Sequence, residues 1–172
     1  SPVYGALNRG LKLSPVKQLD GARWTKLIVN LNNGLFAATR RTAQQFFAHP
    51  GGKLIATLVM REGLAVARKS KARLQPIPLA SPLLLHSFAL LPLPIAVKVF
   101  ERRAEETLSS QFTTYGSTLQ SLLKNEPTEI DELNGAIVRL GSAIGVPTPV
   151  NQAVTDAVRA QGRGSAPLTF EA

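Results

Sequence analysis

Apolar side chains recur every three to four residues along most of the chain, which is the spacing of one face of an α-helix. The clearest stripe consists of Trp24, Ile28, Leu31 and Leu35, at positions i, i+4, i+7 and i+11. No segment sustains the alternation of apolar and polar residues that is typical of half-buried strands. The sequence therefore predicts an all-α fold.

Breaks in this periodicity divide the chain into helices. We expect a long helix over 21–48, ended by "HPGG", and a second helix over 53–69. Helical pieces follow between 79 and 100, then helices over 101–110, 117–124, 128–144 and 150–160, with a loop at "TTYGS" (113–117). Gly145, followed by Pro147, is a common way to end a helix. One helical domain over 1–162 and a flexible tail over 163–172 are expected.

The apolar segment 79–100 is long enough to cross a membrane, but it contains Pro82, Pro92 and Pro94 as well as His86. Three prolines would repeatedly interrupt the hydrogen bonds of a membrane-spanning helix. We interpret the segment as buried helical pieces joined by a bend, and we expect no membrane association.

Composition adds a strongly basic charge to this picture. The 172 residues, enough for one domain with a sizeable core, hold 20 Lys and Arg against 11 Asp and Glu. One basic cluster stands out, formed by Arg68, Lys69, Lys71 and Arg73. Aromatic residues do not interleave with it and no nucleic-acid-binding signature accompanies it, so a solvated surface is favoured and nucleic-acid binding is the more remote alternative.

Several kinds of site are absent from the sequence. There is no cysteine, which excludes disulfides and thiolate ligands and is compatible with a reducing compartment; we expect a cytoplasmic location. His49 and His86 have no partner at ligand spacing, so no metal site is predicted. Gly51 and Gly52 lack the preceding strand and the spacing of a dinucleotide-binding turn. A nucleotide cofactor would therefore need another segment to bind its phosphates. The chain also starts within a helix-forming segment, and we expect it to be part of a longer protein.

Lys26, Asn30 and Asn33 lie opposite the apolar stripe of the first helix, at i, i+4 and i+7. They form either a solvated face or a ligand-binding face. Asn lowers helix propensity by roughly half a kcal/mol relative to Ala, so an ordinary surface would more readily use Glu, Lys or Gln. One ammonium and two carboxamides could bind a ligand that carries a carboxylate and a carbonyl, and a partly desolvated lysine could act as an acid.

Four of the eleven acidic residues fall within "NEPTEIDELNG" (125–135). Thr128 and Asp131 have the spacing of a capping box, and acids in the first turn favour the positive end of a helix dipole. Glu129 lies off the apolar stripe of this helix and could point toward a cleft beside the core. Ser117 and Gln120 repeat the capping spacing, which predicts an N-cap hydroxyl at Ser117.

Two blocks, "WTKLIVNLNN" and "STLQSLLKNEPTEIDELNGAIVRLGSAIGVPTPVN", closely resemble the C-terminal domain of the ketopantoate reductase (2-dehydropantoate 2-reductase) family. The resemblance extends from about residue 20 to 160 and is most specific in "PTEIDELNG" and "GVPTPVN". It implies a helical domain of the 6-phosphogluconate-dehydrogenase-like type, with the N-terminal Rossmann domain that binds NADPH absent from this chain. The small 2-oxoacid substrate would lie between the two domains.

The resemblance also implies roles for individual residues. Lys26 matches the catalytic lysine that protonates the alkoxide formed at C2 of the substrate, and Glu129 matches the acid that binds the substrate's hydroxyl side and supports the lysine. Asn30 and Ser117 match substrate-binding positions, with Asn33 as a further candidate. Cofactor-binding residues would lie mainly on the Rossmann domain.

The sequence departs from the family at two positions. Phe36 stands where many relatives have Asn, and Ser121 where Asp is common. These departures bear on the exact 2-oxoacid. The implied activity is NADPH-dependent reduction of 2-dehydropantoate in pantothenate and coenzyme A biosynthesis, with the isolated chain inactive. The alternative is a non-catalytic helical module that forms a homodimer and retains the motifs.

Overall fold

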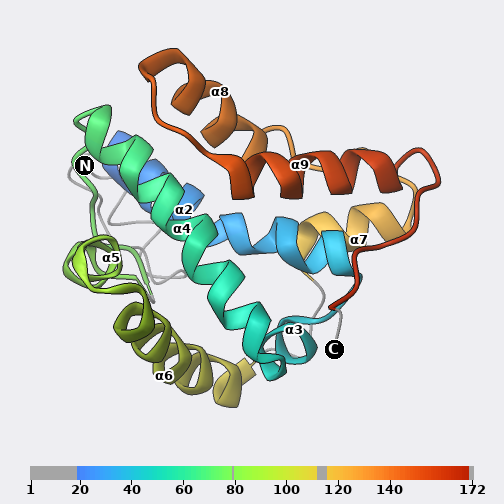
Figure 1. Ribbon diagram of the computed structural model, residues 1–172, viewed down its shortest axis with the longest axis horizontal. Coiled ribbons are helices and arrows are strands. Elements are labelled where there is room, and N and C mark those ends of the chain that lie inside the picture. The colour runs from blue at the N-terminus through green and yellow to red at the C-terminus, as the bar shows by residue number, and fades with distance from the viewer. Residues whose placement is uncertain (1–18, 79, 112–115, 171–172) are drawn as a thin grey trace, which may run out of the picture.

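The computed structural model describes residues 19–78, 80–111 and 116–170. Two long helices, α2 (Leu19–Thr39) and α4 (Pro50–Lys69), cross in the middle of the molecule (Figure 1). The others are α3 (Ala43–Ala48), α5 (Pro82–Leu90), α6 (Leu93–Gln111), α7 (Ser117–Leu123), α8 (Asn134–Ile144) and α9 (Pro149–Gln161). Within the described ranges no β-strand forms, so the all-α prediction is confirmed.

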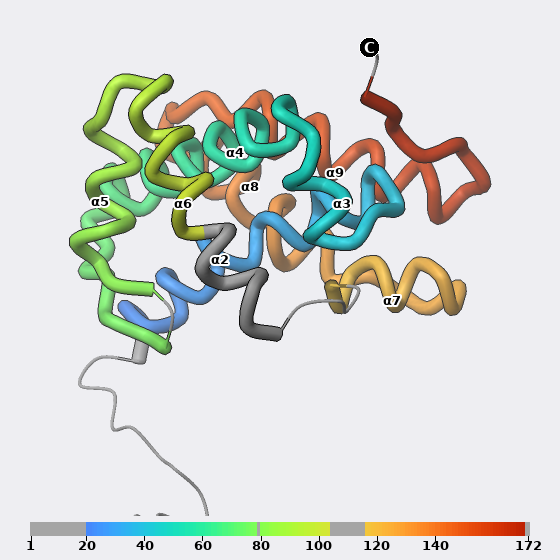
Figure 2. The backbone as a smooth tube through the Cα atoms, turned by 90° about the horizontal axis from the view of Figure 1, so that it is seen from below, coloured from blue at the N-terminus to red at the C-terminus, as the bar shows by residue number. Residues whose placement is uncertain are grey.

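Helices from the two halves of the chain cover different sides of this central pair. α5 and α6 pack against α4 along one side, while α8 and α9 pack together on the other and both reach α4 (Figure 1). α9 and α7 also pack against α2 (Figure 2). None of the helices described here is both long and apolar enough to cross a membrane.

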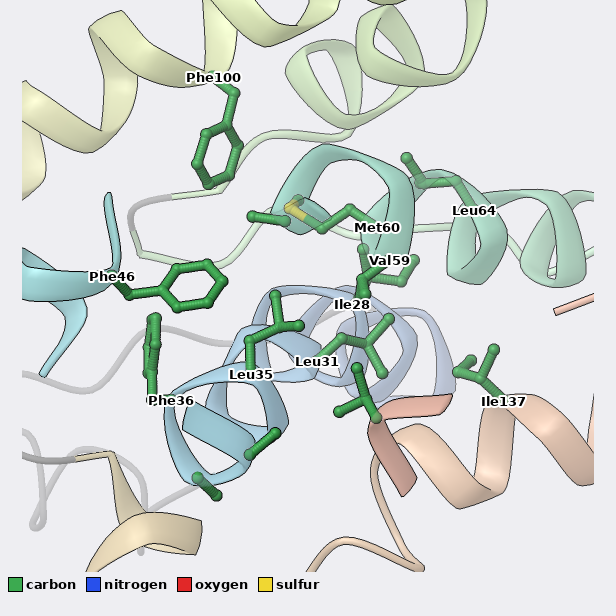
Figure 3. Packing of buried hydrophobic residues seen from close by; sticks show 14 of the residues in the cluster. Ile28, Leu31, Leu35, Phe36, Phe46, Val59, Met60, Leu64, Phe100 and Ile137 are labelled. Atoms are coloured by element: carbon green, nitrogen blue, oxygen red, sulfur yellow. The ribbon is translucent and has the colours of Figure 1, made fainter. Parts of the chain in front are cut away.

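The predicted stripe of α2 forms the centre of the core. Ile28, Leu31 and Leu35 are each at most 3% exposed. They face α4, and Figure 3 shows how apolar side chains from α3, α6 and α8 close the ends of this layer. Burying this stripe removes several large side chains from water, at about 1.5–3 kcal/mol each. The labelled partners in that view are Phe46, Val59, Met60, Leu64, Phe100 and Ile137.

The expected single helix over 21–48 is wrong, because the chain turns after Thr39. Arg40 adopts a left-handed φ of 50°, and a new helix starts behind it. Thr42 begins α3 with a capping box: its hydroxyl accepts from the Gln45 N–H at 3.2 Å, and the Gln45 side chain accepts from the Thr42 N–H at 3.0 Å. The turn lets Phe46 and Phe47 fold back onto Phe36, with ring centroids 5.5–5.6 Å apart.

The pair Gly51-Gly52 does not break a helix but lies in the first turn of α4, which begins at Pro50 rather than at residue 53. His49 caps this turn, accepting from the Gly51 N–H through Nδ1 at 3.1 Å. A Cβ on Gly52 would lie 2.1 Å from the carbonyl oxygen of Phe46, so glycine is required for α4 to approach α3. These glycines therefore serve packing.

Two other helix starts also differ from expectation. α6 is continuous from Leu93, so the helix expected at 101 begins eight residues earlier. The helix expected at 128 begins only at Asn134, after a turn over 129–133. The end of that helix is as predicted, because Gly145 closes it with a left-handed φ of 69°.

Residues 162–170 contain no helix, as expected of a tail, yet they contact the body of the domain. The N–H of Leu168 donates to the carbonyl oxygen of Ala38 at 2.8 Å. The ring of Phe170 stacks on His49 at 4.1 Å and lies beside Phe46 at 5.3 Å. This end of the chain thus covers the aromatic cluster where α3 meets α4. Of the loop expected at 113–117, residues 113–115 lie outside the described residues.

Candidate functional site

The polar face of α2 carries three of the predicted site residues. Lys26 is exposed, and Asn30 and Asn33 are partly buried. Their spacing places them on one side of the helix, with Asn33 about 10 Å along the axis from Lys26. Opposite them, the apolar stripe is fully packed. Within the described part of the chain, none of these three side chains has a hydrogen bond or salt bridge to another residue.

Ser117 is brought to this face by the packing of α7 against α2. The Oδ1 of Asn33 lies 3.1 Å from the position that a Cβ would take on Gly116, immediately before Ser117. The predicted N-cap role of Ser117 is wrong: Gly116 is the N-cap, and no side chain caps α7. Ser117 is instead the first helical residue, and its side chain is exposed.

Glu129 lies in the turn that precedes α8, and its neighbour Ile130 packs this turn against α2. The carbonyl oxygen of Glu129 accepts from the N–H groups of Glu132 and Leu133 at 3.1 and 3.0 Å, which closes the turn. Ile130 is buried at 2%, and its Cδ1 lies 3.0 Å from the position of a Cβ on Gly34 of α2. The carboxylate of Glu129 is exposed and forms no salt bridge with Lys26.

The capping box predicted at Thr128 and Asp131 does not form. The N-cap of α8 is Leu133, which provides no side-chain hydrogen bond. Asp131 instead accepts from Arg159 of α9, at 2.9 Å from Nε and 2.6 Å from a terminal guanidinium nitrogen. Both contacts go to the same oxygen, Oδ1, of this partly exposed pair, and the arginine lies 28 residues away.

Three residues that the sequence analysis overlooked form a polar network between the helices. Asn134 and Asn151 are fully buried, and the Nδ2 of Asn134 donates to the Oδ1 of Asn151 at 3.0 Å. Asn134 also donates to the carbonyl oxygen of Leu31, at 3.2 Å. Asn151 donates to Glu62 of α4 at 2.7 Å. The network therefore joins α8 and α9 to both central helices.

Glu62 also holds the start of α9. Its two carboxylate oxygens accept from the backbone N–H groups of Val150 and Asn151, each at 2.9 Å. The first N–H groups of a helix lack partners within the helix, and a carboxylate there also favours the positive end of its dipole. Pro149, the first residue of α9, was a signal for this helix start, but no local pattern indicates Glu62, 88 residues earlier.

The two departures from the family pattern lie in different surroundings. Phe36 is 7% exposed and belongs to the aromatic cluster with Phe46 and Phe47. It therefore faces the core rather than the polar face of α2. Ser121 lies within α7, partly buried.

Two kinds of ligand can be compared with the residues described here, a metal ion and the pyrophosphate of a nucleotide. No three His, Asp or Glu side chains among them come close enough together to hold a metal ion. The paired glycines at 51–52 lie inside a helix and contact Phe46, so they do not fit a pyrophosphate. The arrangement can offer a small anion one ammonium, two carboxamides and a hydroxyl, and the carboxylate of Glu129 can accept from a ligand hydroxyl.

Comparison with known proteins places this arrangement in a family. The model of the family described as the C-terminal domain of ketopantoate reductase PanE/ApbA matches residues 18–162. The chain belongs to this family. The match includes every predicted site residue, and it confirms the resemblance carried by the two sequence blocks.

Two curated proteins of the ketopantoate reductase family are similar to this chain at modest sequence identity. The chain is 28% identical over 156 residues to a 2-dehydropantoate 2-reductase of Pyrobaculum aerophilum, covering 88% of this chain and 47% of that protein. It is 49% identical over 47 residues to the enzyme of the same name from Aquifex aeolicus, covering 27% of this chain and 15% of that protein. The chain thus spans at most about half the length of these curated relatives.

Solved structures show the same fold. A PanE/ApbA family ketopantoate reductase from Ralstonia eutropha JMP134 superimposes with a TM-score of 0.67 at 31% identity, over 90% of this chain and 45% of that one. A D-mandelate dehydrogenase solved with NADH and anilino(oxo)acetate gives a TM-score of 0.65 at 23% identity, over 86% and 42% of the two chains. At that identity the second likeness concerns the fold alone.

Proposed function

We propose that this chain is the substrate-binding part of an NADPH-dependent 2-oxoacid reductase, with 2-dehydropantoate as the substrate. The observation that carries the proposal is the polar face of α2. Lys26, Asn30 and Asn33 lie there without partners among the described residues, next to the start of α7 and the turn of Glu129. The amide groups of Asn30 and Asn33 are not among the buried atoms that lack a partner, so they are accessible to solvent and to a ligand. A bound oxoacid could replace the water at these groups.

The chemistry suits these groups. The carboxamides of Asn30 and Asn33 and the hydroxyl of Ser117 can hold the carboxylate and carbonyl oxygens of a 2-oxoacid. The ammonium of Lys26 stabilises the negative charge that develops on the carbonyl oxygen, and it donates the proton that completes the alcohol. Glu129 accepts a hydrogen bond from the substrate's hydroxyl and keeps Lys26 oriented.

The paired glycines of α4 do not form a dinucleotide-binding turn, so the hydride donor is expected to be bound mainly by a Rossmann domain that is not part of this chain. A reduced nicotinamide supplies the hydride when it is bound. The part of the reaction assigned to this chain is therefore substrate binding and proton donation.

The test follows NADPH oxidation with 2-dehydropantoate in the full-length protein that contains this chain. Lys26→Ala and Glu129→Ala should each lower kcat/KM by about 100-fold or more, as loss of a general acid or its partner does. Lys98→Ala and Glu132→Ala are matched controls, because both side chains are exposed and lie outside the proposed site. Near-wild-type rates for both site variants would reject the proposal.

A homodimer-forming module is the second candidate, and one observation favours it. Leu83 and Leu90, seven residues apart on one face of α5, are 83% and 72% exposed, and Ile95 nearby is 48% exposed. Exposed leucines in a row are typical of contact surfaces. Sedimentation velocity should then show a dimer that Leu83→Gln with Leu90→Gln dissociates. A wild-type monomer at high protein concentration would exclude this candidate.

A further inference from the structure

We infer that Asn134 is a positioning residue, which holds the turn of Glu129 against α2 and so sets where the carboxylate lies relative to Lys26. The inference rests on the proposed function. Asn134 directly follows the turn over 129–133 and is fully buried. Its Nδ2 donates to the carbonyl oxygen of Leu31, which is next to Asn30 in α2. One amide therefore connects the two parts of the proposed site.

A second hydrogen bond, to Asn151 of α9, holds the side-chain amide of Asn134 in place. Its Nδ2 also donates to the Oδ1 of Asn151, whose own Nδ2 donates to the Val59 carbonyl oxygen at 3.1 Å and to Glu62 at 2.7 Å. The chain of contacts ends on α4, the helix against which α2 packs. Asn134 consequently cannot shift without breaking its hydrogen bonds to α2 and α9, and the turn ahead of it shares this constraint.

A third contact shows how closely the turn and α2 approach each other. The Oδ1 of Asn134 lies 2.3 Å from the position of a Cβ on Gly34, and Ile130 reaches the same spot. This oxygen is buried and has no hydrogen-bond partner. An unpartnered buried oxygen is unfavourable, and a leucine of similar size would avoid it. Positioning explains why the amide is there, because only its NH₂ group can bridge Leu31 and Asn151.

The functional consequence follows from geometry. A displacement of reacting groups by about 1 Å can lower a rate by about 100-fold. Without the Leu31 contact, the turn keeps the packing of Ile130 on α2 but loses the hydrogen bond that orients it there, so it can shift. Such a shift moves Glu129 but leaves Lys26, Asn30 and Asn33 in place on their helix. Asn134→Ala should therefore act on the reaction through Glu129.

A double-mutant cycle tests this in the full-length protein, with NADPH and 2-dehydropantoate. Asn134→Ala should lower kcat/KM by about 10- to 100-fold in the wild-type background and by less than about threefold when Glu129→Ala is already present. Ile137→Val is the matched control: Ile137 is equally buried in the same helix, but its side chain is apolar and its only hydrogen bond to the turn, from the backbone N–H to Leu133, is kept in the variant. Its small effect should be the same in both backgrounds.

Hydrogen exchange gives a second readout that does not depend on turnover. The N–H groups of Glu132 and Leu133 donate to the carbonyl oxygen of Glu129, and Asn134→Ala should accelerate their exchange by about tenfold or more. Ile137→Val should leave them unchanged. If Asn134→Ala does not fold, Asn134→Ser retains one donor and undergoes the same cycle.

The outcomes separate the inference from the proposed function. A wild-type rate for Glu129→Ala would refute the proposed role of the carboxylate, and the inference with it. A reduced rate for Glu129→Ala, together with an equal effect of Asn134→Ala in both backgrounds, would refute the inference alone. An effect of Asn134→Ala no larger than that of Ile137→Val, or unchanged exchange in the turn, would also refute it.

Discussion

For Gly34→Ala, the packing described above decides whether the substitution raises or lowers the free energy of unfolding. In an isolated helix this change stabilises, by about 1 kcal/mol, because alanine is the better helix former. In α2 the new Cβ would lie 2.3 Å from the Oδ1 of Asn134, 2.9 Å from Val154 Cγ1 and 3.0 Å from Ile130 Cδ1. Asn134 cannot turn away without giving up its bonds to Leu31 and Asn151.

The magnitude follows from these contacts. Overpacking costs about 1–3 kcal/mol, and each hydrogen bond lost or stretched at Asn134 costs about 1 kcal/mol. Offset by about 1 kcal/mol of helix propensity, the free energy of unfolding should fall by about 1–4 kcal/mol. For a domain of this size, a loss of 2 kcal/mol lowers Tm by about 4–8 °C.

Thermal and urea unfolding of the variant measure this directly. Gly162→Ala is the control, because Gly162 has a helical φ of −62° and its new Cβ would approach nothing closer than 3.5 Å, so its stability should change little. Gly34→Ala combined with Asn134→Ala should destabilise less than the sum of the single changes, since the second removes the nearest clash. A Gly34→Ala variant as stable as wild type would show that α8 does not approach α2 this closely.

Two further substitutions test contacts between residues that lie far apart in the sequence. Glu62→Ala should lower the free energy of unfolding by about 2 kcal/mol, because it removes a charged acceptor from the first turn of α9; in urea melts the exposed Glu132→Ala should stay within about 0.5 kcal/mol of wild type. Phe170→Ala should cost about 1–2 kcal/mol through the lost stack on His49 and the lost cover of the aromatic cluster. The exposed neighbour Thr169→Ala is its control, and equal melting temperatures for the two variants would contradict a packed chain end.

Where a pattern acts within one helix, the sequence was enough to predict the structure. The stripe of Ile28, Leu31 and Leu35 lies in the core because helical periodicity alone decides which side is buried. Gly145 ends α8 because a left-handed residue favours glycine. The same reasoning placed Lys26, Asn30 and Asn33 on one polar face.

Capping patterns were less dependable, because a cap competes with partners that lie elsewhere in the fold. Thr42 and Gln45 form a capping box that the sequence analysis overlooked, although the spacing was visible. Thr128 and Asp131 have the same kind of spacing and form none, because Asp131 binds Arg159. No local rule can rank these two cases, since the deciding partner lies 28 residues away.

The roles of Glu129 and Ser117 came from the resemblance alone, since periodicity did not distinguish them from their neighbours. The residues missed altogether, Asn134, Asn151 and Glu62, act only across helices. An asparagine at the start of a helix resembles an ordinary cap residue until its buried partners are known. Sequence reasoning could therefore indicate the polar face of α2, but not what holds the facing turn in place.

The same contrast explains why the sequence motifs identify the family more directly than the substrate. The blocks "PTEIDELNG" and "GVPTPVN" carried the most specific part of the resemblance, and each contributes one buried asparagine to the same hydrogen bond. The hydrogen bonds of these amides hold α8 and α9 against α2 and α4. A match to these blocks therefore indicates how the helices pack. Of the residues that would contact a substrate, Lys26 and Glu129 are exposed and Asn30 is partly buried, although Glu129 lies in the same block as Asn134. Substrate choice therefore has to be measured at Lys26, Asn30 and Glu129, because the two buried asparagines that hold the helices together are inaccessible to a substrate.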